Sequence, residues 1–260
     1  MINATPARGR YGMAEGILAM LELYNFDKST CSQKARICLA EKKLEWSNRR
    51  VDLAGEENLS PAYLALNPNG VVPTLVHDGR AIIESTVICE YLDEIYPHEP
   101  RLAPEDAMVR AEMRVWLRYI DEVPSMAIRV PTFQRIKLPQ FKKMSAREFD
   151  AYADRNPLRK PFLRRMGRGG FSREDVDMAI EQLDQSLERM ESALAGGAWL
   201  VGDCYSIADI CMAPLLQRLE DLDMAEMWRA TRPRVGEWYA RIRARPAYGV
   251  AFYPGSLLAD

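Results

Sequence analysis

The chain has 260 residues, of which 48% are hydrophobic and 28% charged, a balance typical of globular proteins. Its formal net charge of -2 gives no overall attraction to nucleic acid or to an anionic membrane, so we expect neither as a partner. No stretch approaches the roughly 20 consecutive apolar residues that a membrane-spanning helix needs.

Strand and helix patterns alternate along residues 20–98 in the order βαβαββα. The predicted strands are 21–24, 45–51, 71–76 and 81–83, and the predicted helices run from a cap within 29–32 to about 43, over 61–66 and over 85–96. A hairpin that follows an α/β unit implies a mixed sheet with helices packed on it. Residues 1–19 match neither pattern, and we expect them to form a flexible extension. We also expect the natural start of the protein to lie nearer Met20 than Met1.

Only helical patterns occur over residues 104–260, after a linker that is rich in proline. Spacings of three and four between apolar residues predict long helices over 106–123 and 176–194. Ser206 and Asp209 have the spacing of a capping box, in which a serine and an acid satisfy the free N–H groups at a helix start.

The segment 131–171 is less regular, because it holds four prolines. It also contains a basic stretch, 159–168, with Arg159, Lys160, Arg164, Arg165 and Arg168. This stretch could cover a site or attract an acidic substrate, although a solvated face is the more common meaning of a charge run.

The number and spacing of the cysteines and histidines argue against a metal site. The five cysteines include no CxxC pair and no set of zinc ligands, and two histidines are too few for a histidine-rich site, so we expect no metal. A Ser-His-Asp triad is possible by count, but His77 lies in a His-Asp-Gly turn and His98 follows a proline that ends a helix. Unpaired cysteines favour a cytoplasmic location.

The first candidate for chemistry is Ser29–Ser32, the sequence Ser-Thr-Cys-Ser, between the first strand and the first helix. A helix start presents free N–H groups and the positive end of the helix dipole, both of which stabilise a thiolate. The thiolate could belong to Cys31 or to a thiol ligand held by the Ser29 hydroxyl. Simple helix capping is the alternative and requires no function.

Two further pairs of consecutive residues could bind a peptide-like ligand. A cis bond at Val72–Pro73 would free the Val72 backbone to pair with such a ligand, although trans proline on an edge strand is commoner. At Glu84–Ser85, we expect Ser85 to cap a helix whose start binds a carboxylate, while Glu84 binds an ammonium. These charges match an amino-acid head group, and a solvated helix start is the alternative.

The chain resembles the cytosolic glutathione transferases from about residue 20 to 250 through four motifs in the family's order. Residues 23–37 resemble the S-S-C-S-x-R-x-R-I start of zeta-class members, 66–75 resemble L-N-P-x-x-x-V-P-T-L, 84–92 resemble [EQ]-S-x-x-I-x-x-Y-L, and 202–209 resemble G-x-x-x-S-x-A-D. The resemblance implies a thioredoxin-like α/β domain over 20–98 that binds glutathione, the co-substrate. An all-helical domain over 104–260 would bind the second substrate.

The same resemblance implies roles for single residues. Ser29 would hydrogen-bond the glutathione sulfur and favour its thiolate. Cys31 matches the cysteine of the zeta-type motif, which takes part in thiol exchange in zeta-like dehalogenases. Val72, before a cis Pro73, would pair with the cysteinyl backbone of glutathione.

The remaining glutathione contacts follow from the later motifs. Glu84 and Ser85 would hold the γ-glutamyl ammonium and carboxylate, and Asn58 would reach the glycyl end. Asp209 is expected to be a structural cap and not a catalytic acid.

A narrower resemblance concerns the second substrate. Residues 84–92, 110–116 and 143–149 are similar to those of bacterial β-etherases, which cleave lignin-type aryl ethers, whereas zeta-class isomerases lack so long a middle segment. The expected reaction is attack of glutathione thiolate on a small hydrophobic electrophile. Trp116 and Tyr119 are candidate walls of its pocket, although aromatic residues at helical spacing more often belong to a core.

Three alternatives remain open from the sequence. The Ser-x-Cys-Ser loop is also similar to that of glutathione-dependent reductive dehalogenases, and Cys31 could serve as the nucleophile of a thiol transferase. The same fold could bind glutathione or hydrophobic ligands without catalysis. In each case the family resemblance implies a homodimer.

Overall fold

The computed structural model describes residues 20–97 and 100–258, so the expected extension 1–19 lies outside them. The strands are β1 Leu21–Asn25, β2 Ser47–Arg50, β3 Thr74–His77 and β4 Arg80–Ile83. The α-helices are α1 Thr30–Glu41, α2 Pro61–Leu66, α3 Ser85–Ile95, α4 Ala107–Glu122, α5 Pro124–Ala127, α6 Arg129–Ile136, α7 Leu138–Phe141, α8 Ala146–Asp154, α9 Lys160–Met166, α10 Arg173–Ala193, α11 Ile207–Asp221, α12 Glu226–Arg229, α13 Pro233–Arg243 and α14 Pro246–Ala251. Two 3-10 turns, η1 Glu57–Leu59 and η2 Leu194–Gly196, complete the order.

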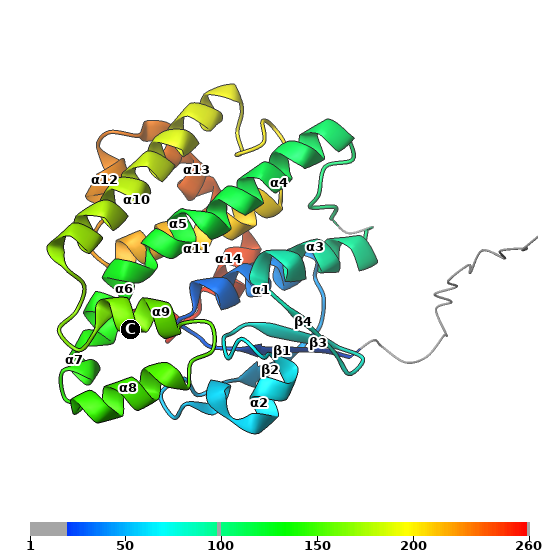
Figure 1. Ribbon diagram of the computed structural model, residues 1–260. Helices are drawn as coiled ribbons and strands as arrows, with labels where there is room; N and C mark the ends of the chain where they lie inside the picture. Colours follow the sequence, from blue (N-terminus) through cyan, green and yellow to red (C-terminus); the bar gives the residue numbers. More distant parts are fainter. Residues whose placement is uncertain (1–19, 98–99, 259–260) are drawn as a thin grey trace, which may run out of the picture.

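One mixed sheet organises the amino-terminal half, with the strand order β2-β1-β3-β4. β1 runs parallel to β2 and antiparallel to β3, and β3 forms a hairpin with β4. α1 and α3 cover one face of the sheet and α2 lies on the other (Figure 1). The predicted α/β unit with a final hairpin is therefore confirmed. Two strands are shorter than predicted: β2 spans Ser47–Arg50 and not 45–51. β3 begins at Thr74 and not at residue 71, because Pro73 cannot donate to a strand ladder.

The carboxyl-terminal half is helical, as predicted, and no described helix is long and apolar enough to span a membrane. α11 is its central element and is buried along almost its whole length. The predicted capping box starts it: Asp209 accepts from the Ser206 N–H at 3.0 Å. Buried residues of the sheet, of α1 and of α11 form one continuous core, so the two halves pack as a single body.

The proline-rich middle segment folds as the short helices α6 to α9 and has a small aromatic core of its own. Prolines occupy the first turns of α7 and α9, where a missing N–H costs nothing, so they start these helices instead of preventing them. Figure 1 shows α6 and α9 at the side of the molecule where α1 begins. This segment therefore flanks the loop in which we expect the chemistry.

Candidate functional site

Ser29 is the N-cap of α1, the position predicted for a thiolate-binding hydroxyl. Its Oγ accepts a hydrogen bond from the Ser32 N–H at 3.3 Å, and its own N–H donates to the Phe26 carbonyl at 3.1 Å. Within the described chain the hydroxyl hydrogen of Ser29 has no acceptor. A half-buried hydroxyl at a helix start is therefore free to donate to a ligand that bears negative charge.

Two buried arginines hold the loop that precedes Ser29. Arg36 donates to the Asn25 side chain at 2.7 Å and to the Asp27 carbonyl at 2.7 Å. Arg218, which α11 contributes, donates to the carbonyl of Lys28. Because each guanidinium is fixed by burial, the loop is held in place before any ligand binds.

The Cys31 thiol lies in the first turn of α1, is half-buried, and interacts with several cations. Its sulfur interacts electrostatically with Lys34 of the same helix, and with Arg129, Arg159 and Arg218 from the helical half. Positive charge from two halves of the chain thus converges on the loop that contains Ser29 and Cys31. Such a field favours a negatively charged ligand at this loop.

The Val72–Pro73 bond is cis, as we expected, and both residues are buried. Val72 lies just before β3 and outside the strand ladder. Among the described residues, its backbone N–H and C=O have no hydrogen-bond partner. Buried backbone groups are nearly always paired, so this pair of open groups is suited to an extended peptide ligand.

Glu84 and Ser85 lie between β4 and the start of α3. Glu84 has φ of 69° and occupies the N-cap position itself, so our expectation that Ser85 caps the helix is wrong; Ser85 is the first helical residue. A left-handed backbone at a residue other than glycine is strained, and such strain is concentrated at binding sites. The Glu84 carboxylate is exposed and accepts from Asn69 Nδ2 at 3.2 Å.

Asn58 lies in the 3-10 turn before α2, and its side-chain amide donates to the Gly70 carbonyl at 2.7 Å. This bond joins the Asn58 turn to the segment that leads to Val72. Asn58 therefore has a structural contact of its own, and its second amide N–H and its amide oxygen are left for a ligand.

Trp116 and Tyr119 point into the helical half. Trp116 is buried, and the Tyr119 hydroxyl lies 2.9 Å from Ser186 Oγ on α10. The Arg189 guanidinium lies 4.1 Å from the Tyr119 ring centroid and 4.9 Å from that of Trp116. These contacts are with the core and with α10 and give the expected pocket no support, so the role of both residues as its walls stays a prediction.

The basic stretch 159–168 divides into two parts. Arg164 and Lys160 form ion pairs with Asp154 at 2.6 and 3.0 Å, and Arg165 pairs with Asp175, all on the exposed surface. Arg159 instead is half-buried, stacks on the Phe133 ring and interacts electrostatically with Cys31. The expectation of a solvated face therefore holds for these three neighbours but not for Arg159.

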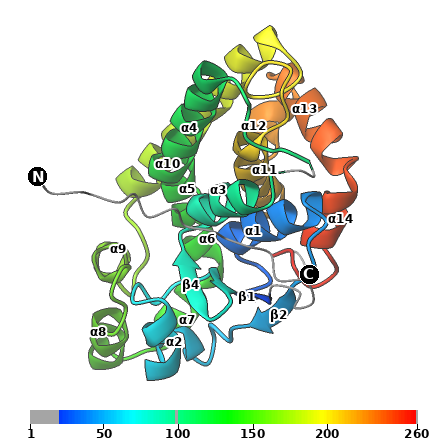
Figure 2. The same cartoon turned by 90° about the vertical axis from the view of Figure 1, so that its right-hand side faces the viewer.

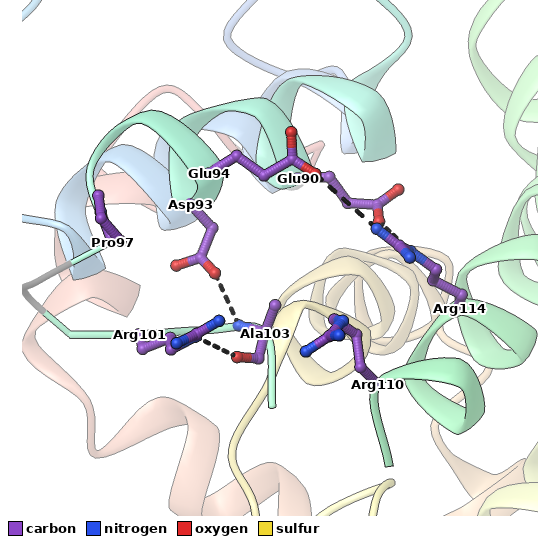
Figure 3. A pocket seen from close by; sticks show the side chains of 8 residues that line it. All are labelled: Glu90, Asp93, Glu94, Pro97, Arg101, Ala103, Arg110 and Arg114. Atoms are coloured by element: carbon purple, nitrogen blue, oxygen red, sulfur yellow. Dashed lines mark hydrogen bonds and ion pairs between the residues drawn. The ribbon is translucent and has the colours of Figure 1, made fainter. Parts of the chain in front are cut away.

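A pocket of the structure lies away from the Ser29 loop and lacks the residues predicted for the reaction. Figure 3 shows it between the carboxyl-terminal half of α3, the linker and α4, with Glu90, Arg110 and Arg114 in its wall. Glu90 and Arg114 pair with each other at 2.7 Å. None of the residues predicted for chemistry lines this pocket. Among the described residues, no group of three acids, cysteines or histidines is placed to hold a metal.

Comparisons with known proteins agree with this geometry. Residues 23–100 match the family model for the glutathione S-transferase N-terminal domain, and 151–241 match that for the C-terminal domain. Protein LigF of Sphingobium sp. strain SYK-6 is 36% identical over 87% of this chain and 91% of its own. The tetrachloro-p-hydroquinone reductive dehalogenase of Sphingobium chlorophenolicum is 29% identical over 89% and 95%.

Comparison of the fold with solved structures identifies the same relative. The crystal structure of the beta-etherase LigF from Sphingobium sp. strain SYK-6 superposes with a TM-score of 0.82 and 34% identity, over 90% of this chain and 98% of that one. Both halves of the family architecture are present, in the expected order, around a cis Val72–Pro73 bond and a serine-capped α1. The chain is a member of the glutathione S-transferase family.

Proposed function

We propose that this glutathione transferase cleaves aryl ethers, as a β-etherase does, with Ser29 as the residue that activates glutathione. The observation that carries the proposal is the free hydroxyl hydrogen of Ser29 at the start of α1, in a loop that Arg36 and Arg218 hold in place. The similarity to LigF over nearly the whole chain supports the choice of ether as substrate.

The chemistry is a substitution at carbon. The glutathione thiol loses its proton to solvent, and its thiolate attacks the carbon that bears the aryloxy group. A C–S bond forms, the C–O bond breaks, and the electron pair leaves with the phenolate. Ser29 and the helix start increase the thiolate fraction, and holding both reactants together supplies the rest of the acceleration.

Glutathione would lie along the edge formed by β3 and the start of α3. The open backbone groups of Val72 would pair with its cysteinyl residue, Glu84 would bind the γ-glutamyl ammonium, and the free N–H groups at Ser85 would bind its carboxylate. Asn58 would donate its second amide N–H to the glycyl carboxylate.

Reductive dehalogenation is the second candidate, because Cys31 lies in the same turn as Ser29 and faces four cations. In that reaction Cys31 would take part in thiol exchange with glutathione. Similarity to a reductive dehalogenase over 89% of this chain supports it.

We further propose that the protein acts in the cytoplasm as a homodimer, without a metal. The support for a dimer is family membership. Light scattering of the purified chain distinguishes a dimer from a monomer directly.

A substrate panel with two variants tests the proposed reaction. It contains a β-aryl ether, a chlorinated hydroquinone, maleylacetoacetate and an aryl halide, each with glutathione, for wild type, Ser29→Ala and Cys31→Ser. We expect phenol release from the ether that falls sharply in Ser29→Ala and persists in Cys31→Ser. Dehalogenation that depends on Cys31 would favour the second candidate, and no turnover of any compound would contradict both.

A further inference from the structure

Three cations in the middle segment have no acidic partner: Arg129 at the start of α6, Lys137 after its end, and Arg159 before α9. Within residues 20–97 and 100–258, none of them lies within ion-pair distance of a carboxylate. Their neighbours behave differently, since Arg135 and Arg155 each form an ion pair at 2.7 Å, with Asp223 and Glu56 respectively.

The two guanidiniums flank a linked pair of aromatic rings. Arg129 lies 5.7 Å from the centroid of the Phe162 ring, and Arg159 lies 5.5 Å from that of Phe133. The two rings pack edge to face with centroids 5.0 Å apart. Arg129, the ring pair and Arg159 therefore form one continuous stack, in which Phe133 is buried.

The three cations are half-buried, and their mutual repulsion shows in their pKa values. Burial lowers the pKa of Arg159 to about 10, and repulsion by Arg129 adds to that decrease. Burial also lowers the pKa of Arg129 and of Lys137, and repulsion by Arg159 adds to the decrease at Lys137.

Few groups oppose this positive charge. Cys31 acts on both arginines and the Tyr152 hydroxyl acts on Arg159. Glu84 acts on Arg129 and Glu56 on Lys137, both from beyond ion-pair distance. The cluster is thus cationic and faces the reactive loop.

Arg36 is a buried guanidinium whose donors are paired, in contrast to Arg159. Arg36 donates to the Asn25 side chain and to the carbonyls of Asp27 and Ala251. The Arg159 side chain donates to no described residue; its Nε is fully shielded, as are those of Arg218 and Arg241, but its two terminal nitrogens are not. Stacking on a ring does not satisfy N–H donors, so Arg159 retains donors for a ligand.

We propose that Arg129, Lys137 and Arg159 bind a carboxylate on the aromatic second substrate, which makes the preferred substrate an aromatic acid. The inference rests on the proposed function and specifies its substrate class. Guanidinium groups bind a carboxylate through paired hydrogen bonds, and the half-buried Phe162 ring beside Arg129 offers an apolar contact for the substrate's ring. Because the cluster faces Cys31, the acid would be anchored beside the sulfur of glutathione.

A matched pair of substrates tests the proposal: a β-aryl ether with a ring carboxylate, and its methyl ester. Wild type is expected to prefer the acid. Arg159→Met is expected to lower kcat/KM for the acid by about 10- to 100-fold, the loss of one charge-assisted hydrogen bond, with little change for the ester. Arg129→Gln should act in the same direction, and Arg164→Met, which removes a surface ion pair, should change neither.

Two outcomes would overturn the proposal. Equal use of acid and ester by wild type would show that no carboxylate is recognised. An Arg159→Met effect confined to the KM for glutathione would show that the cluster serves the tripeptide instead. Circular dichroism of each variant identifies loss of folding, in which case Arg159→Lys, which keeps the charge but not the paired geometry, replaces Arg159→Met.

A binding measurement separates this inference from the proposed reaction. Sodium benzoate is titrated into wild type, Arg159→Met and Arg164→Met by calorimetry at saturating glutathione. Binding that is lost only in Arg159→Met supports the acid site even if no ether is cleaved. Ether cleavage without benzoate binding overturns the acid site and leaves the proposed function intact.

Discussion

The ammonium nitrogen of Lys34 lies 3.1 Å from a carboxylate oxygen of Asp121, and this ion pair joins α1 of the sheet half to α4 of the helical half. Lys34 is fully buried, one turn beyond Cys31, and Thr86 Oγ1 donates to the second oxygen of Asp121 at 2.6 Å. The contact thus links three helices directly beneath the reactive loop.

Removal of Asp121 should destabilise the protein, because it leaves Lys34 buried without a counter-charge. The Asp121 side chain is 42% exposed, so water compensates in part, and we expect Asp121→Asn to lower the free energy of unfolding by about 2 kcal/mol. Urea denaturation measures it. Glu122→Gln is the control: it breaks the exposed Arg118 pair and should cost less than about 0.5 kcal/mol. Equal losses in the two variants would contradict the structural role of the Lys34 pair.

Ser29 and Cys31 should differ in their effect on ether cleavage. Ser29→Ala removes a hydrogen bond to a charged sulfur, so kcat/KM should fall by about 10- to 100-fold. Cys31→Ser should retain most of the activity. Thr30→Ala, which removes the hydroxyl of the intervening residue, serves as the matched control in the same steady-state assay. A larger loss in Cys31→Ser than in Ser29→Ala would assign the main role to the cysteine.

Glu84 should determine glutathione affinity and not the rate at saturation. Glu84→Gln removes the expected partner of an ammonium, and we expect the KM for glutathione to rise by about tenfold with kcat little changed. Asn58→Ala should have a smaller effect on KM, since the Asn58 amide already donates to the Gly70 carbonyl. Initial rates at varied glutathione concentration test both variants. An unchanged KM in Glu84→Gln would place the ammonium elsewhere.

Asp209 should be a major source of stability. Its carboxylate is fully buried and accepts from Trp238 Nε1 at 2.7 Å, the Leu200 N–H at 3.0 Å and the Ser206 N–H at 3.0 Å. Asp209→Ala leaves these buried donors unpaired, at a cost of about 3 kcal/mol or more. Thermal or urea unfolding measures the loss, and a loss below about 1 kcal/mol would contradict the structure.

The same carboxyl makes stability depend on pH. Burial raises the pKa of Asp209 to about 6, above the usual value of 3.8, so the folded protein holds this proton more tightly than the unfolded chain. The contribution of Asp209 therefore increases as pH falls through 6. Relative to Asp209→Asn, which cannot titrate, wild type should gain about 1 kcal/mol in unfolding free energy between pH 7 and pH 5. A constant difference across that range would exclude the raised pKa.

Local signals in the sequence are sufficient for much of this fold. The spacing of apolar residues predicts the strands and helices from β1 to α3. The spacing of Ser206 and Asp209 predicts a capping box, which forms at the start of α11. Ser29 was identified because a hydroxyl before a helical run is a local feature. Ser85 was misassigned as a cap because the left-handed backbone of Glu84 has no sequence signal.

The cationic side of the site could not be predicted in the same way. Arg129 and Arg159 lie more than ninety residues from Cys31 in the chain, and only the tertiary fold of the middle segment brings them near it. Their sequence neighbours are ordinary surface charges, so composition does not distinguish an arginine that turns inward. Tertiary packing decides which members of a charge run are exposed and which face a site.

The ionisation of bound glutathione tests the central claim most directly. Ultraviolet difference spectra of thiolate, recorded over a pH series with and without glutathione in a Cys31→Ser background, give the pKa of the bound thiol. We expect a pKa at least about one unit below the usual thiol value of about 8.5, and a return toward that value when Ser29→Ala is added. A bound thiol with the pKa of free glutathione in both proteins would contradict the account.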